Sequence, residues 1–208
     1  MINVNCQSSI KIKESKILYF DPLKMNEVDT SDKADFIFIT HPHYDHFDIN
    51  DIKLIKKDST KIVGPKDILD KCIGIFDKDN IIIIEPNNTI TIDNIKITTV
   101  PAYNLNKNFH KKEYNWLGYV IELDNKKYYI AGDTDYIEEN TNIDCDIAFI
   151  PIGGVYTMDH KEAADFVNKL KPKQVVPIHY GMIVGTYNDF LHFKESVNVE
   201  VLELIEVN

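Results

Sequence analysis

Residues 35–46 read DFIFITHPHYDH, an apolar run that leads directly into three histidines and an aspartate. The apolar first half is typical of a short strand buried on both faces. At its end, His41 and His43 point to the same side, because side chains two apart in extended backbone share a face. Asp45 and His46 follow where the chain turns, so they can reach toward a second position. Imidazole nitrogens and a carboxylate suit Zn²⁺, Mn²⁺ or iron, which favours a metal site over a polar loop that happens to be rich in histidine.

Two further strand ends carry residues of the same kind. Asp133 follows the apolar stretch YYIAG, where Gly132 lets the backbone turn sharply. A carboxylate there could bridge two metals, or it could cap a helix that starts near Tyr136. His179 ends the run QVVPIH, where a lone histidine would more often be structural. Three such strand ends instead predict that these side chains converge at one edge of a sheet and form a metal site.

The rest of the chain alternates short strands with a few helices. Apolar spacing and turn residues predict strands at residues 9–13, 16–20, 61–63, 81–84, 89–92, 95–100, 116–123, 127–131, 146–151, 173–178 and 199–205. Helical spacing, and a proline at one first turn, predict helices at residues 49–57, 65–72, 159–170 and 188–196. Residues 101–113 are polar and irregular, so we expect a functional loop there. We find no linker or repeat in residues 1–208, and we expect one domain with two β-rich halves and helices outside.

The composition is that of a globular protein with an acidic surface. The 33 acidic and 23 basic residues give a formal net charge of −10, which disfavours a broad nucleic-acid-binding surface. The negative charge does not exclude a small phosphorylated substrate, because a bound divalent cation can dominate the local field. The longest strictly aliphatic run, residues 81–84, is far shorter than the ~20 residues that a membrane span needs. The first residues also lack the pattern of a signal peptide.

The three cysteines, Cys6, Cys72 and Cys145, are odd in number and widely separated, which argues against a disulfide framework. Each has apolar neighbours, so we expect buried, reduced side chains. Together with the charge and the absence of an apolar span, this predicts a cytoplasmic protein. We expect its partner to be a small-molecule substrate, either neutral or anionic. We expect it to bind neither nucleic acid nor a membrane. The oligomeric state stays open.

The motifs together carry a family resemblance. The pattern His41-x-His43-x-Asp45-His46, followed by GDT at residues 132–134 and a late strand-end histidine, resembles the metallo-β-lactamase superfamily. Within it, the chain looks similar to the branch of small metal-dependent hydrolases that includes ascorbate-6-phosphate lactonase. The resemblance covers nearly the whole chain. It implies an α+β fold, a four-layer αββα sandwich in which two mixed β-sheets face each other with helices on the outer faces.

The resemblance also implies a dinuclear centre at one edge between the sheets, with zinc as the first choice and manganese or iron as alternatives. The implied first-metal ligands are His41 and His43, the implied second-metal ligands are Asp45, His46 and His179, and the implied bridge is Asp133. The superfamily normally supplies another histidine where this sequence has Tyr103. We expect His110, seven residues further along, to replace it, the alternative being a surface histidine.

This ligand set predicts hydrolysis. A water bound to such metals has its pKa lowered toward ~7 and would attack a carbonyl carbon or a phosphorus atom. Asp45 or Asp133 would accept the proton. The predicted substrate is therefore a small ester, lactone, amide or phosphoester. Backbone N–H groups of residues 151–159 could receive an anion; the candidate substrate contacts are Tyr103, Asn104, Tyr156 and His160.

Some alternatives stay open at this point. His160 could instead be an exposed first-turn residue, and Trp116 could line the site or simply pack in the core. A similar ligand set can hold iron, so an iron-dependent oxidoreductase is the second functional hypothesis. A nuclease or RNA-processing enzyme is disfavoured by the charge of −10 and the lack of a long basic arm. A non-catalytic binding module is disfavoured because only one expected ligand is displaced.

Overall fold

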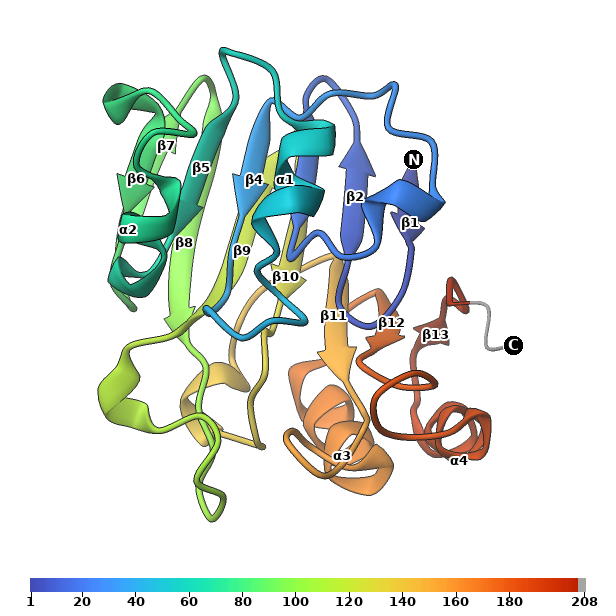
Figure 1. Cartoon of the computed structure of the whole chain (residues 1–208). Helices are drawn as coiled ribbons and strands as arrows, with labels where there is room; N and C mark the ends of the chain where they lie inside the picture. Colours follow the sequence, from blue (N-terminus) through green and yellow to red (C-terminus); the bar gives the residue numbers. More distant parts are fainter. Residues whose placement is uncertain (206–208) are drawn as a thin grey trace.

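The computed structural model describes residues 1–205, and its strands form two sheets (Figure 1). The first sheet has six strands in the order β1-β2-β3-β4-β5-β6. Their bounds are β1 (Ile2–Val4), β2 (Ile10–Lys13), β3 (Ile17–Phe20), β4 (Phe36–Phe38), β5 (Lys61–Gly64) and β6 (Ile81–Ile83). Strands β1 to β3 pair antiparallel, and β3 to β6 pair parallel. The sheet is therefore mixed, as expected.

The second sheet has seven strands in the order β13-β12-β11-β10-β9-β8-β7. Their bounds are β7 (Thr89–Ile92), β8 (Ile95–Pro101), β9 (Leu117–Leu123), β10 (Lys126–Ile130), β11 (Ile147–Pro151), β12 (Gln174–Ile178) and β13 (Glu200–Val201). Strands β7 to β10 form an antiparallel meander, and β10 to β13 pair parallel. This sheet is also mixed.

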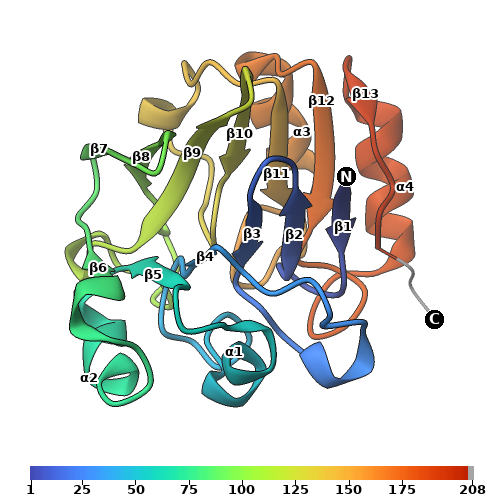
Figure 2. The same cartoon turned by 90° about the horizontal axis from the view of Figure 1, so that it is seen from above.

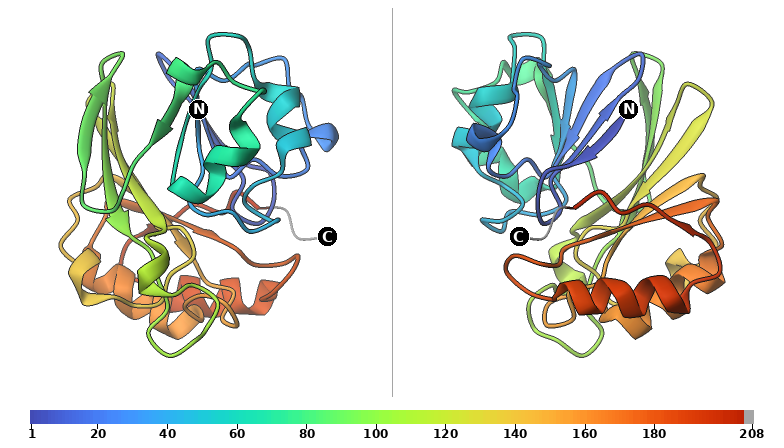
Figure 3. Two further views of the ribbon diagram at one scale, coloured as in Figure 1. Left: turned by 60° about the vertical axis from the view of Figure 1, so that its left-hand side comes forward. Right: turned by 90° about the vertical axis from the view of Figure 1, so that its right-hand side faces the viewer.

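Helices cover the outer face of each sheet. They are α1 (Ile49–Ile55), α2 (Leu69–Cys72), α3 (His160–Leu170) and α4 (Tyr187–Ser196). Short 3₁₀ turns lie at η1 (Met25–Glu27), η2 (Lys66–Ile68), η3 (Lys78–Asn80), η4 (Lys112–Tyr114) and η5 (Glu138–Asn140). Seen from above, α1 and α2 lie beyond the first sheet, and α3 and α4 lie on the other side of the second (Figure 2). The side views show the same four layers, which confirms the predicted sandwich (Figure 3).

Strand β4 shows why its sequence is continuously apolar. Phe36 and Phe38 point into the core between the sheets, whereas Ile37 and Ile39 pack on the side of α1 and α2. The Phe38 ring stacks on Phe20 with 4.7 Å between ring centroids. Both faces of the strand are therefore removed from water, and alternation between apolar and polar residues is lost.

The strand predictions need correction at both ends of the chain. The first strand of the chain, β1, was not predicted, because its three residues show too short an apolar pattern. The strand predicted at residues 199–205 shrinks to β13, a two-residue strand at the edge of the sheet that pairs with β12. It is an edge strand, so few ladder hydrogen bonds hold the alternating residues that follow it.

The predicted burial of the cysteines is confirmed for two of the three side chains. Cys72 and Cys145 are buried and free, as expected, but Cys6 is only partly buried, because it lies in the turn between β1 and β2. Within residues 1–205, we find no helix that is long and apolar enough to cross a membrane.

Candidate metal centre

The motif after β4 forms a strand, a tight turn and a helix start. The backbone N–H groups of His46 and Phe47 both donate to the His43 carbonyl oxygen, at 3.0 and 2.9 Å. Asp48 then caps α1 by accepting hydrogen bonds from two first-turn N–H groups. This turn brings His46 back toward the strand end that carries His41. The carboxyl ends of β4, β10 and β12 point in the same direction, so the three predicted strand ends share one edge (Figure 1).

The seven predicted ligands come together in this structure. They form three overlapping groups in which the ligand atoms lie within 4.8 Å of one another: His41, His43 and His110; His41, His46 and Asp133; and Asp45, His46 and His179. Only His43 is half-buried, and the other six side chains are buried. The sharing of His41 and His46 between groups makes one continuous centre.

Asp133 lies in the middle of this centre. Its Oδ2 atom is 3.1 Å from His179 Nε2, 3.4 Å from His110 Nε2 and 3.9 Å from His41 Nε2. Its Oδ1 atom is 3.4 Å from His46 Nε2. Oδ2 therefore faces histidines of both the first and the third group, and a carboxylate in that position can be shared between them. The alternative, that Asp133 caps a helix near Tyr136, has no support, because the short η5 that begins at Glu138 has Ile137 as its N-cap residue and no side-chain cap.

The donor atoms fit a divalent cation. His46 Nε2, His110 Nε2 and Asp133 Oδ1 are buried without a hydrogen-bond partner. An unsatisfied buried polar atom costs about 1–3 kcal/mol, and bound cations would give these three atoms the partners that they lack. Ligands of a tetrahedral zinc ion are roughly 3.4 Å apart. Asp133 Oδ1 and His46 Nε2, which lie 3.4 Å apart, meet that spacing.

Hydrogen bonds from outside the cluster orient three of the rings. His46 Nδ1 lies 2.8 Å from Asp21 Oδ2, and His110 Nδ1 lies 3.1 Å from Asn104 Oδ1. His41 Nδ1 lies 2.9 Å from the Thr40 hydroxyl. With Nδ1 occupied, each ring presents Nε2 to the centre, as metal-ligating histidines with an outer partner do.

The electrostatics divide the histidines into two kinds. Burial, with the neighbouring His46 charge, lowers the pKa of His41 well below its usual value, and burial lowers the pKa of His110 to about 4. Burial opposes charge on His179 and His46 as well, but nearby carboxylates outweigh it. Asp133 and Asp45 raise the pKa of His179 to about 9, and Asp133 with Asp21 raises the pKa of His46 well above its usual value. Metal binding at neutral pH must therefore displace protons from these two rings.

Asp21 is a site residue that sequence reasoning missed. It is fully buried and accepts hydrogen bonds from the Thr40 backbone N–H at 2.8 Å and the Thr40 hydroxyl at 2.7 Å. Burial raises the pKa of Asp21, and the adjacent His46 ring opposes that rise. The available signal was its position directly after the strand that ends at Phe20, like that of Asp133 after its own strand.

Asp21→Asn is expected to weaken metal binding ~10- to 100-fold, because outer partners of ligating histidines contribute at that level. Titration of the metal-free protein with Zn²⁺ would measure the change. Asp35→Asn is the matched control, because Asp35 precedes β4 at its other end and bonds the Ile17 N–H and Lys57. Equal zinc affinity of Asp21→Asn and the wild type would exclude Asp21 from the centre.

The loop of residues 101–113 positions His110. The Asn104 N–H donates to the His110 carbonyl oxygen at 2.7 Å, and the His110 N–H donates to Asn104 Oδ1 at 3.1 Å. Asn104 Nδ2 in turn donates to Asp135 Oδ1 and to the Tyr156 carbonyl oxygen. Lys107 also pairs with Asp135. Asn104 thus holds His110, a structural task that differs from the substrate contact predicted for it.

The other predicted substrate contacts point in different directions. The Tyr103 hydroxyl donates to Glu139 at 2.7 Å, so its polar end is already engaged. The Tyr156 ring meets the edge of Phe109, 4.7 Å between centroids, beside the His110 loop. His160 begins α3, and its Nδ1 lies 3.1 Å from Asp189 of α4, so the substrate contact predicted for it stays a prediction.

Trp116 packs directly on the cluster. Its ring stacks on His41 with 5.0 Å between centroids, and it meets His43 edge-on at 4.8 Å. Its Nε1 donates to Asp67 at 2.8 Å. The buried indole therefore packs against two predicted ligands, so Trp116 both lines the centre and belongs to the packed interior.

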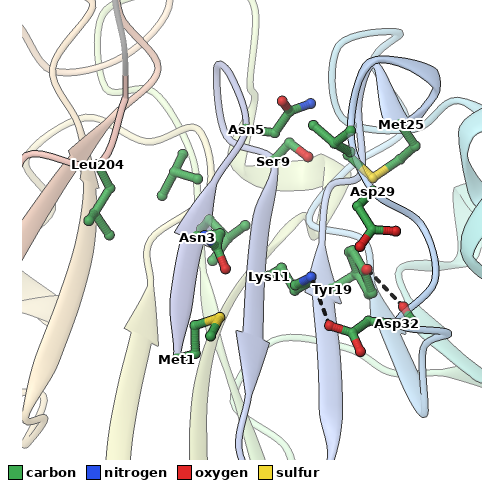
Figure 4. A pocket seen from close by; sticks show the side chains of 13 residues that line it. Met1, Asn3, Asn5, Ser9, Lys11, Tyr19, Met25, Asp29, Asp32 and Leu204 are labelled. Atoms are coloured by element: carbon green, nitrogen blue, oxygen red, sulfur yellow. Dashed lines mark hydrogen bonds and ion pairs between the residues drawn. The ribbon is translucent and has the colours of Figure 1, made fainter.

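A separate hollow lies at the β1 edge of the first sheet (Figure 4). It measures about 540 Å³, and Asn3, Lys11, Met25 and Leu204 are among its lining residues. Lys11 pairs there with Asp32 at 3.1 Å. None of the predicted ligands lines this hollow, so it is distinct from the metal centre.

Comparisons with known proteins agree with the fold and the motif. The family model of the beta-lactamase superfamily domain matches residues 4–180. A UPF0173 metal-dependent hydrolase of Thermococcus onnurineus is 36% identical over 202 residues, which cover 91% of this chain and 88% of the relative. A crystal structure from Parabacteroides distasonis, of a protein assigned to the metal-dependent hydrolases, superimposes with a TM-score of 0.83 at 30% identity. That match covers 98% of this chain and 93% of the other.

A more distant structure shares the fold alone. It comes from Thermotoga maritima, and the protein is assigned as a zinc-dependent hydrolase of the metallo-β-lactamase superfamily. The TM-score is 0.64 at 21% identity, with 99% of this chain and 92% of the other covered. Together with the histidine and aspartate cluster, these matches identify the family. The chain belongs to the metallo-β-lactamase superfamily and, within it, to the UPF0173 metal-dependent hydrolases.

Proposed function

We propose that this hydrolase uses a dinuclear metal centre to cleave a small ester, lactone, amide or phosphoester. The observation that carries the proposal is the central Asp133, whose two oxygens face His46 on one side and His110 and His179 on the other. In this proposal His41, His43 and His110 hold the first metal, Asp45, His46 and His179 hold the second, and Asp133 bridges them.

Divalent ions in this centre would supply a water of lowered pKa and polarise the oxygen of the scissile bond. The protein's own part is to hold the charge pattern and to move a proton. Side-chain hydrogen bonds from His179 and His46 outweigh the burial of Asp45 and keep its pKa low. Asp45 is thus ionised at neutral pH. It is 8% exposed, more than Asp133, and can receive the proton of the attacking water.

Zinc is the proposed metal, with manganese and iron as alternatives. Five imidazoles and two carboxylates form a nitrogen-rich set, which zinc accepts readily. The Thermotoga maritima protein with the same fold is assigned as zinc-dependent, which supports the choice. Iron in the same ligands would instead support the second hypothesis, an oxidoreductase.

The surroundings of the centre favour a substrate with an apolar part. Large apolar side chains next to the predicted ligands are exposed, among them Tyr44 at 75% and Phe109 at 45%. Two nearby lysines are already paired, Lys107 with Asp135 and Lys112 with Glu139. An anionic substrate would therefore gain little from these lysines, and uncharged esters and lactones are the first candidates. A lactone would also agree with the proposed resemblance to the branch that includes ascorbate-6-phosphate lactonase.

Metal analysis of protein purified without chelators or a histidine tag tests the proposal. About two equivalents of zinc or manganese are expected, together with hydrolysis of p-nitrophenyl esters or lactones that is lost without metal. A phosphodiester, bis-p-nitrophenyl phosphate, serves as the comparison substrate. One equivalent of iron with oxygen-dependent turnover would favour the oxidoreductase. Protein that binds no divalent metal would refute the proposal.

His110→Ala is expected to lower the metal content from about two equivalents to about one. The substitution removes one of the three ligands of the first group, and the two remaining histidines bind a metal more weakly. Metal analysis after dialysis would detect the loss. His192→Ala, at an exposed position of α4, is the matched control and should keep both equivalents. Unchanged stoichiometry in His110→Ala would remove His110 from the ligand set.

A further inference from the structure

Gln7 is a buried polar residue beside the metal centre to which neither the ligand pattern nor the family match assigns a role. It lies in the turn between β1 and β2, and its side chain is fully buried. Its backbone is left-handed, with φ of 50°. A residue other than glycine in this region costs of order 1 kcal/mol or more and persists only where the surroundings require it.

The backbone of Gln7 joins the two sheets at the centre. Its carbonyl oxygen accepts a hydrogen bond from the His179 N–H at 2.8 Å. His179 also has a left-handed backbone, with φ of 58°. Two strained residues, one at the end of β12 and one beside β2, are thus tied to each other across the sandwich. This bond fixes the backbone from which the His179 ring reaches the cluster.

The side chain of Gln7 reaches the same group of ligands. Its Nε2 lies 3.4 Å from Asp45 Oδ2 and 3.0 Å from His179 Nε2. A carboxylate oxygen only accepts hydrogen bonds, so the amide N–H can donate to Asp45. His179 Nε2 also faces Asp133 Oδ2 at 3.1 Å and Asp45 Oδ2 at 3.6 Å. Gln7 therefore contacts two of the three residues in the proposed second-metal group.

We propose that Gln7 is a positioning residue of the second metal site. Its backbone carbonyl holds His179, and its amide N–H holds the Asp45 carboxylate, so the two ligands are fixed relative to each other before metal binds. The inference rests on the proposed metal centre. A neutral donor suits this place, because a buried lysine would add a positive charge that competes with the cation.

Gln7→Met tests the side-chain contact. Methionine has a similar length and keeps the backbone carbonyl, but it cannot donate to Asp45. In a Zn²⁺ titration of the metal-free protein, we expect the second equivalent to bind ~10- to 100-fold more weakly, with the first equivalent unchanged. The chain's other glutamine provides the matched control: Gln174→Met removes an exposed amide that bonds Glu200 and should leave both equivalents unchanged.

A second variant and a stability measurement separate positioning from folding. Gln7→Asn keeps a neutral amide donor on a side chain one methylene shorter and should retain more second-site affinity than Gln7→Met. The melting temperature of metal-free Gln7→Met should fall by only a few degrees, because the Nε2 contacts are lost but the Gln7 Oε1 atom has no partner to lose. Equal affinities in wild type and Gln7→Met, or weaker binding of both equivalents alike, would refute the role of Gln7. Wild-type protein that binds no zinc would refute the metal centre itself and the role with it.

Discussion

Asp133→Ala is expected to lower the rate of hydrolysis by roughly a thousand-fold or more, which corresponds to about 4 kcal/mol of lost transition-state stabilisation. The oxygens of Asp133 face His46, His110 and His179 together. Its removal takes a negative charge and a shared ligand from both proposed metal positions. We therefore expect the metal content to fall along with the rate, while the fold survives.

Two further variants make that result specific. Asp133→Asn keeps the shape of the side chain and one oxygen, so it should retain some metal but still lose most of the activity. Asp144→Ala removes an aspartate whose side chain is 84% exposed and should match the wild type. Steady-state rates, metal analysis and circular dichroism would be measured on all of them. Turnover of Asp133→Ala at the wild-type rate would contradict the bridging role.

Removal of metal by a chelator is expected to lower the melting temperature by roughly 8–16 °C. A ligand present at a thousand times its dissociation constant stabilises the folded state by about 4 kcal/mol. Each kcal/mol shifts the melting temperature by about 2–4 °C in a protein of this size. Differential scanning calorimetry before and after chelation, and again after added Zn²⁺, measures the shift. A melting temperature that chelation leaves unchanged would contradict a tightly bound centre.

The same experiment has a pH dependence with a defined sign. In the metal-free protein the pKa of His179 is raised to about 9, above the 6.5 of an unperturbed histidine. Its contribution to the free energy of unfolding is therefore fully present below about pH 6.5 and is lost as the pH rises through about 9. Metal binding needs the deprotonated ring, so metal affinity changes in the opposite direction. The stabilisation by Zn²⁺ should thus be larger at pH 9 than at pH 6.5.

Much of the fold could be predicted because its signals are local. The run FIF of β4 is apolar at every position, since both of its faces are buried, and it leads into the turn that carries His41 and His43. The hairpin of β9 and β10 has Asp124 and Asn125 at its turn, both with positive φ. β13 was predicted too long because strand length depends on the neighbouring strand, which sequence alternation does not report.

The sequence by itself determined the order of most elements and six ligand-type residues at strand ends, because each of these follows from residue types within a short segment. The resemblance to the metallo-β-lactamase superfamily added the fold class and His110 as a candidate ligand. The tertiary structure alone showed that His110 reaches the cluster, since this depends on the Asn104 bonds that close its loop. It alone revealed Asp21 and Gln7. These residues meet His46 and His179, which lie 25 and 172 positions away in the chain, and no local pattern encodes a contact that only the packing of two sheets creates.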